Sequence, residues 1–150
     1  MSAPRPPAFF AKPGRRLYWL HQLHAAGLDA RIMRTSPHRK GCFVINVAVM
    51  VPGMGKVRVS LIFPLDRPEA VAVYAAGPNH SPHRYRDGAL CMWFPRDDAS
   101  RRWTADDGPV NLLGHAIAHL AREEWWRRTG EWVGDEVPHG EVSSSRNVMP

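Results

Sequence analysis

Two segments with regularly spaced apolar side chains, joined by a glycine-containing turn, constrain the fold most. Residues 42–51 (CFVINVAVMV) are rich in β-branched side chains, and residues 56–64 (KVRVSLIFP) alternate apolar with polar side chains. The intervening PGMG, at 52–55, provides the glycines that a hairpin turn requires. The sequence therefore predicts two antiparallel strands, the first buried and the second with one face in water.

Helices are predicted on either side of this hairpin. Residues 14–26 (GRRLYWLHQLHAA) carry leucines near helical spacing, and Gly27 provides a stop signal. Within residues 106–128 (DDGPVNLLGHAIAHLAREEWWRR), Asp107 is placed to cap a second helix and Pro109 falls in its first turn. Five apolar side chains of this second segment share one helical face: Leu112, Leu113, Ala116, Ile117 and Leu120.

Short strands are predicted at residues 29–35 (DARIMRT) and 69–76 (EAVAVYAA), which brings the number of strands to four. Residues 77–108 carry prolines and glycines without apolar periodicity, so we expect a long irregular loop, and such loops are usually functional. The expected fold class is α+β: an N-terminal helix, a four-stranded antiparallel meander, a long active-site loop and a C-terminal helix.

Length and composition favour one soluble domain. With 150 residues and 44% hydrophobic side chains, the chain is long enough for a single packed core. Residues 14–140 are expected to form it, between a flexible Pro-rich N-terminus at 1–13 and a flexible tail at 141–150. No run reaches the roughly 18 apolar residues that span a bilayer, and the first ten residues do not resemble a signal peptide. We therefore expect a cytoplasmic protein without membrane association.

The chain is basic, with a formal net charge of +6 and a pI of about 10.0. Such a charge favours an acidic partner. The arginines and lysines are spread along the sequence, and nothing resembles an arginine-rich arm, a recognition helix or an aromatic RNA-binding motif. We therefore expect a protein partner and rank direct nucleic-acid binding last.

Cys91 is the main candidate for covalent chemistry. It lies in the long loop, three residues after the turn-forming Gly88, and His83 precedes it by eight residues. The thiolate is the reactive form of cysteine, and a nearby imidazole or backbone N–H group favours it. The alternative is that Cys91 is a small buried apolar side chain, as most free cysteines are. Cys42 and Cys91 have no metal-ligand spacing and are too few for a disulfide scaffold.

His115 and His119 are four residues apart on the second predicted helix, a spacing at which two imidazoles can share a zinc ion. The zinc-protease pattern requires a glutamate directly after the first histidine, where this chain has Ala116. Both histidines lie away from the leucine-rich face, so we expect a polar face packed under a tail or a partner, and no metal site. Five tryptophans are expected to form a packed shell around the loop: Trp93, Trp103, Trp125, Trp126 and Trp132.

The order of these features resembles the ubiquitin-conjugating enzyme fold. In that family a strand meander runs into a proline-rich turn, then a His-Pro-Asn stretch, a glycine and the active-site cysteine. Here FPLDRP, SPHRYRDGALC and a tryptophan follow one another before the second helix. The chain resembles in particular the bacterial ubiquitin-conjugating-like proteins encoded beside cGAS-like nucleotidyltransferases in CBASS anti-phage operons, because EEWWRRTGEWVGDEVPHG is similar to their tails. The resemblance covers roughly residues 14–140.

The resemblance implies a role for each loop residue that matches the family pattern. Cys91 matches the thioester-forming cysteine, Gly88 the glycine three residues before it, and Pro82 the middle of the His-Pro-Asn stretch. Ser81 replaces the first histidine, and His83 stands in place of the asparagine. A neutral imidazole there could donate a hydrogen bond to an oxyanion or act as a base, and both roles stay open.

The activity that the resemblance implies is that of an acyl carrier. Cys91 would accept the C-terminal acyl group of a partner protein, expected to be a cGAS-like nucleotidyltransferase, as a thioester and pass it to an amine or another nucleophile. The outcome would be regulation of anti-phage signalling. Tyr85 and Trp103 would shape the loop, and a separate activating enzyme would use any ATP, so no metal or organic cofactor is implied. This activity requires an exposed Cys91 sulfur with His83 facing it.

Three other functions remain open. A non-catalytic adaptor would keep the fold and bind the same partner through its aromatic surface, and burial of the Cys91 sulfur would favour it. A cysteine hydrolase would pair Cys91 with His83 or His80 and turn over a small acyl or peptide substrate. A basic nucleic-acid-binding module would show affinity that falls steeply with salt.

Overall fold

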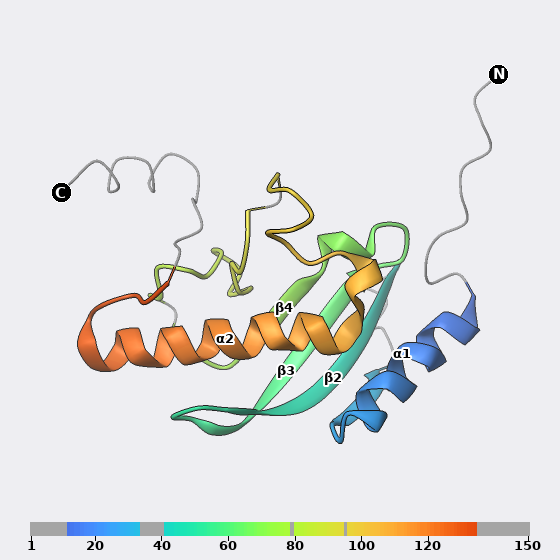
Figure 1. The fold of residues 1–150 in the computed structure, drawn as a ribbon, viewed down its shortest axis with the longest axis horizontal. Helices are drawn as coiled ribbons and strands as arrows, with labels where there is room; N and C mark the ends of the chain where they lie inside the picture. Colours follow the sequence, from blue (N-terminus) through green and yellow to red (C-terminus); the bar gives the residue numbers. More distant parts are fainter. Residues whose placement is uncertain (1–11, 34–40, 79, 95, 135–150) are drawn as a thin grey trace.

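The structure is a computed structural model that describes residues 12–33, 41–78, 80–94 and 96–134. Its elements follow in the order α1 (Pro13–Ala25), β1 (Asp29–Met33), β2 (Cys42–Val51), β3 (Gly55–Pro64), the 3₁₀-helix η2 (Pro68–Ala70), β4 (Ala72–Ala75), the 3₁₀-helix η3 (Ala105–Asp107) and α2 (Gly108–Thr129) (Figure 1). The four strands form one antiparallel sheet in the order β1-β2-β3-β4. This is the predicted α+β fold of the ubiquitin-conjugating type. No helix within the described residues is long and apolar enough to cross a membrane.

The β2–β3 hairpin forms the centre of the sheet. Its strands pair over their full length, from Cys42 opposite Pro64 to Val51 opposite Gly55. Gly55 has a φ of 80°, a conformation that favours glycine at the end of the turn. Alternate side chains of both strands are buried, among them Phe43, Ile45, Val47, Val49, Val57, Val59, Leu61 and Phe63. Burial of each such side chain contributes about 1.5–3 kcal/mol, so the alternation in the sequence determines which face becomes the core.

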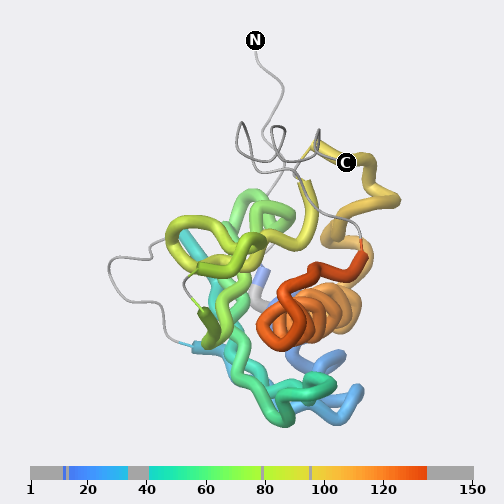
Figure 2. The backbone as a smooth tube through the Cα atoms, turned by 90° about the vertical axis from the view of Figure 1, so that its left-hand side faces the viewer, coloured from blue at the N-terminus to red at the C-terminus, as the bar shows by residue number. Residues whose placement is uncertain are grey.

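Helix α2 lies across one face of the sheet (Figure 1, Figure 2). Its predicted apolar face is buried there: Leu112, Leu113, Ala116 and Leu120 are at most 1% exposed. Three aromatic rings meet in the core, where Trp19 lies 5.3 Å from Phe63 and 5.9 Å from Trp103 between ring centroids. Nε1 of Trp103 also donates to the Gly108 carbonyl at 2.8 Å, which ties the end of the long loop to the first turn of α2.

Three predictions differ from the structure in detail. Strand β4 begins at Ala72, later than predicted, because Pro68 opens a short 3₁₀-helix before it. Asp107 precedes α2 as expected, but its carboxylate accepts hydrogen bonds from the N–H and hydroxyl of Thr104 and so caps η3 instead of α2. Trp125 is 50% exposed, so the tryptophans do not all pack around the loop.

The domain limits predicted from the sequence stay a prediction. Helix α1 begins at Pro13, one residue earlier than the predicted start. The predicted flexible N-terminus at 1–13 lies outside the described residues up to residue 11, and the predicted tail at 141–150 lies outside them entirely. The boundary at residue 140 also falls beyond the described residues.

Candidate active site

Residues 83–91 form a tight hairpin in the long loop. An isolated antiparallel bridge joins Arg84 to Leu90. Gly88 has a φ of 94° in the turn, which side-chain-bearing residues rarely adopt. The backbone conformation of this turn therefore accounts for a glycine three residues before Cys91.

The register of this hairpin sets His83 opposite Cys91, and the Cys91 N–H donates to the His83 carbonyl at 2.9 Å. Directly opposed residues of an antiparallel pair project their side chains to the same face, as do residues two apart along a strand. His83, Tyr85 and Cys91 therefore share one face. The Tyr85 hydroxyl donates a hydrogen bond to the Cys91 sulfur. The structure thus brings three of the predicted site residues together.

Cys91 itself is buried, with an exposed fraction of 2%. Burial raises the pKa of its thiol, and the hydrogen bond from Tyr85 offsets only part of this effect. Burial, together with the same hydrogen bond, also raises the pKa of Tyr85, so the phenol stays protonated and able to donate. His83 is 3% exposed. The expectation of an exposed sulfur is wrong, because the hairpin packs against α2 and the residues that follow it.

A buried ion pair, which the sequence analysis missed, attaches the hairpin to α2. Nε and Nη2 of Arg84 donate to the two carboxylate oxygens of Glu123, each at 2.8 Å, and Nη1 donates to the Ala75 carbonyl at 2.6 Å. The two charged side chains are 6% and 2% exposed. Burial alone would raise the pKa of Glu123, but hydrogen bonds from Arg84 and Ser81 outweigh it and hold this pKa below its usual value. Glu123 is therefore charged at neutral pH.

Two buried histidines and a tryptophan meet beside the hairpin. Trp132, which follows α2, lies 4.0 Å from His83 and 5.2 Å from His119 between ring centroids. His119 is 3% exposed, and its Nε2 has no hydrogen-bond partner among the described residues. Burial lowers the pKa of His119 to about 4, so this imidazole is neutral at neutral pH. His119 thus packs under the residues after α2, as predicted for a polar face covered by a tail.

The other predicted residues lie outside this cluster. Pro82 is exposed next to the hairpin, and Trp103 belongs to the hydrophobic core. His80 packs against Trp126 of α2 at 5.5 Å between ring centroids. Within the part of the chain that the structure describes, no group of three or more His, Cys, Asp or Glu side chains could hold a metal ion.

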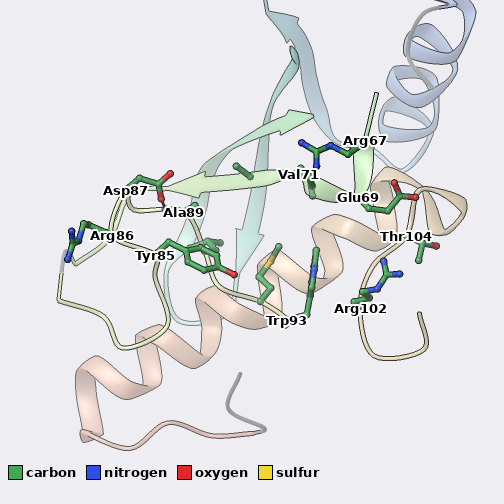
Figure 3. A pocket seen from close by; sticks show the side chains of 14 residues that line it. Arg67, Glu69, Val71, Tyr85, Arg86, Asp87, Ala89, Trp93, Arg102 and Thr104 are labelled. Carbon is green, nitrogen blue, oxygen red and sulfur yellow. Dashed lines mark hydrogen bonds between the residues drawn. The ribbon is translucent and has the colours of Figure 1, made fainter. Parts of the chain in front are cut away.

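The larger of two cavities near the hairpin has a volume of about 1000 Å³. Its lining comes from η2, β4, the hairpin and the loop before η3, and is mostly apolar. Figure 3 shows Tyr85 and Trp93 near its middle, with Arg86 at one end and Arg67 and Arg102 at the other. The phenol that donates to the Cys91 sulfur therefore also forms part of this cavity.

A smaller cavity of about 350 Å³ runs along α2. Its lining includes His115, His119 and Arg122, and no carboxylate. Met92, which follows Cys91 in the chain, lines both cavities. Cys91 is thus next in sequence to a residue that contributes to both cavities.

Of the comparisons with known proteins, one finds a match. A family model described as Type II CBASS E2 protein matches residues 31–140, well over half of the chain. The chain belongs to the Type II CBASS E2 family. No curated protein and no solved structure matches it. Membership in the CBASS E2 family gives the chain an E2-like role, that of a conjugating enzyme in general, and implies protein partners within CBASS.

The residues of the candidate site that the sequence analysis missed are Arg84 and Glu123, whereas Trp132 was expected to pack around the loop and does contact His83. One signal could have found Glu123, because it continues the apolar stripe of α2 that includes Ala116 and Leu120. A carboxylate in line with buried apolar side chains indicates a buried cationic partner. No comparable local signal indicates the contacts of Arg84, which lies 39 residues from Glu123.

Proposed function

We propose that Cys91 accepts the C-terminal acyl group of a partner protein as a thioester and passes it to an amine or another nucleophile. We assign the role of acyl donor to a cGAS-like nucleotidyltransferase of the same CBASS system. Transfer of its C-terminus would then regulate anti-phage signalling. Membership in the CBASS E2 family supports a conjugating role, and the hairpin supports the choice of Cys91.

Two balanced steps make up this chemistry. In the first, the Cys91 thiol loses its proton and the sulfur attacks the carbonyl carbon of an activated C-terminus; the activating group leaves with its electron pair and a proton. In the second, an amine attacks the thioester carbonyl, the C–S bond breaks, and the sulfur leaves with its electron pair and takes up a proton from the amine. A separate activating enzyme supplies the activated acyl group, so the carrier uses no ATP itself.

The observation that best supports the proposal is the shared hairpin face of His83, Tyr85 and Cys91. A hydrogen bond from the Tyr85 hydroxyl stabilises the anionic sulfur that attacks in the first step and leaves in the second. The His83 imidazole projects from the opposite strand toward the same face, where it would donate to the oxyanion or accept a proton. Positioning of donor and acceptor would supply most of the rate.

The larger cavity offers a site for the extended tail of the donor. It is mostly apolar and includes Tyr85. Two carboxylates in its lining, Glu69 and Asp87, already accept hydrogen bonds from Ala105 and Tyr74. Three arginines outnumber these two carboxylates in the lining, so its net positive charge would favour a tail that carries acidic side chains.

Trapping of the thioester tests the proposal directly. The protein is expressed with its operon neighbours, and adducts are compared on non-reducing and reducing gels. We expect a higher-mass adduct that disappears with thiol and with hydroxylamine, and a Cys91→Ser variant that traps a thiol-resistant ester. Cys42→Ser is the matched control, because it removes the other cysteine and should leave the adduct in place. An adduct that persists in Cys91→Ala, or one that resists hydroxylamine, would contradict the proposal.

Burial of Cys91 favours a second candidate function, the non-catalytic adaptor. A protonated, covered thiol is chemically inert, whereas the fold and its aromatic surface could still bind a partner. Phage-challenged cells that carry Cys91→Ala separate the two functions. An adaptor keeps its protective effect in this variant, and an acyl carrier loses it.

A further inference from the structure

The residues that follow α2 turn back along the helix. Gly130 ends the helix with a φ of 80°, and Figure 1 and Figure 2 both show the next residues, in red, returning along its last turns. A Cβ at Gly134 would lie 2.9 Å from the side chain of Arg122, which places Gly134 beside α2 two turns before its end. Residues 131–134 therefore form a short strap over the C-terminal half of the helix.

The strap covers the proposed site through a single side chain. The indole of Trp132 contacts the imidazole of His83 at 4.0 Å between ring centroids. His83 lies opposite Cys91 on the hairpin, and both are at most 3% exposed. Trp132 thus packs against His83, whose side chain shares a hairpin face with that of Cys91.

The indole of Trp132 also packs against His119. Nε2 of His119, under the same indole, has no hydrogen-bond partner among the described residues. A buried nitrogen without a partner destabilises the state that contains it.

Besides Trp132, the strap contacts within the described residues the Thr129 hydroxyl, which accepts from the Glu131 N–H at 3.2 Å, and the Arg122 side chain beside Gly134. Glu131 and Gly134 are exposed, and Val133 is 52% exposed. Gly130, which directly precedes the segment, and Gly134, which ends it, both have a positive φ. A short segment with mostly exposed side chains can open without unfolding of the core.

We propose that Trp132 is a gate over Cys91 and His83: the structure shows it closed, and movement of the strap exposes the sulfur and the imidazole. The gate reconciles a buried thiol with an acyl carrier, since the carrier would react only when a bound partner displaces the strap. Its biological meaning rests on the function proposed above, whereas exposure of the thiol is measured without any acyl donor.

The rate of alkylation of Cys91 by iodoacetamide tests the gate. The experiment uses the full chain with Cys42→Ser, so that one thiol remains, and follows the mass of the intact protein at a fixed, mildly alkaline pH. Trp132→Ala should raise the rate constant about tenfold or more, because an open state populated at roughly 10% or less leaves that much to gain. Trp132→Phe keeps an aromatic ring and should stay near the parent rate.

Trp125→Ala is the matched control, because Trp125 lies near the end of α2, seven residues before Trp132, but is 50% exposed. Its rate should equal that of the parent. Should Trp132→Ala unfold, Gly130→Ala decides, since a side chain at a φ of 80° strains the turn that starts the strap and should also speed alkylation. Equal rates in parent, Trp132→Ala and Gly130→Ala overturn the gate even if a thioester forms. Faster alkylation without any thioester retains the gate and removes the carrier function.

Discussion

Glu123 and His119 lie one helical turn apart on α2 and are equally buried, at 2% and 3% exposure, yet their surroundings differ. Glu123 accepts two hydrogen bonds from Arg84. His119 has an Nε2 without any partner among the described residues. Glu123 therefore stays charged, with its pKa below the usual value, whereas burial lowers the pKa of His119 to about 4 and keeps it neutral.

The ion pair of Glu123 with Arg84 fixes the position of the hairpin on α2, whereas the packing around His119 does not. Removal of one partner from a buried ion pair leaves an uncompensated charge, so Arg84 and Glu123 hold the hairpin on α2 in one arrangement. An unpartnered neutral nitrogen costs less and is satisfied when water reaches it. The ion pair thus positions the backbone of Cys91, and the side of the hairpin near His119 is where the site can open.

The largest effect is expected from loss of the ion pair. Glu123→Ala leaves the Arg84 guanidinium buried without its counter-charge, and we expect the free energy of unfolding to fall by about 3–5 kcal/mol. Urea unfolding followed by circular dichroism measures this loss. The adjacent Glu124→Ala is the matched control: its partners Arg127 and Arg128 are at least half exposed, so the expected loss is about 0–1 kcal/mol. Equal losses of stability in the two variants would contradict the larger contribution expected from the buried Glu123 than from the surface ion pairs of Glu124.

An intermediate effect is expected from pH. The unfolded imidazole of His119 takes up a proton near 6.5 and the folded one only near 4, because burial outweighs the nearby Glu123, and His83, Arg84 and Arg122 oppose protonation further. Between these values the unfolded state binds more protons, so the free energy of unfolding decreases as the pH is lowered from 6.5 to about 4, by about 3 kcal/mol in total. His119→Leu should remove this slope, as measured by urea midpoints across the range.

The same titration separates His119 from Glu123. A carboxylate with a lowered folded pKa stabilises above its unfolded value, near 4.5, and this stability is lost as pH falls through the folded value. In His119→Leu, the remaining pH dependence of the free energy of unfolding should therefore lie at lower pH. His21→Leu replaces an exposed imidazole on α1 and serves as the control that keeps the full slope. A slope unchanged in His119→Leu would mean that another group titrates.

The central part of the fold could be predicted because its signals are local. Strand β2 has the predicted bounds, and β3 begins one residue before the predicted start, since alternation and a glycine turn act over neighbouring residues. The apolar face of α2 follows in the same way from helical spacing. The limits of β4 were missed where a proline started a 3₁₀-helix.

The candidate site could be predicted only in part. Family resemblance singled out His83, Tyr85 and Cys91, which the hairpin brings together. The burial of His83 and Cys91, which the sequence offered only as an alternative for Cys91, has no local signal, because it depends on residues distant in sequence: Glu123, which holds the hairpin, and Trp132, which packs against His83. Gly77 reflects the same packing, since a Cβ there would overlap the Arg84 guanidinium.

The smallest effect is expected from the hydrogen bond within the site. Tyr85→Phe removes the donor to the Cys91 sulfur and should cost about 1 kcal/mol of stability or less. The hydrogen bond lowers the pKa of the thiol against the effect of burial, so its loss should move the midpoint of the pH–rate profile for Cys91 alkylation to higher pH. Tyr74→Phe is the matched control, because its hydroxyl donates to Asp87 and not to the sulfur. If both variants shift the midpoint equally, the effect comes from the loop as a whole, and the hydrogen bond from Tyr85 does not specifically lower the pKa of the Cys91 thiol.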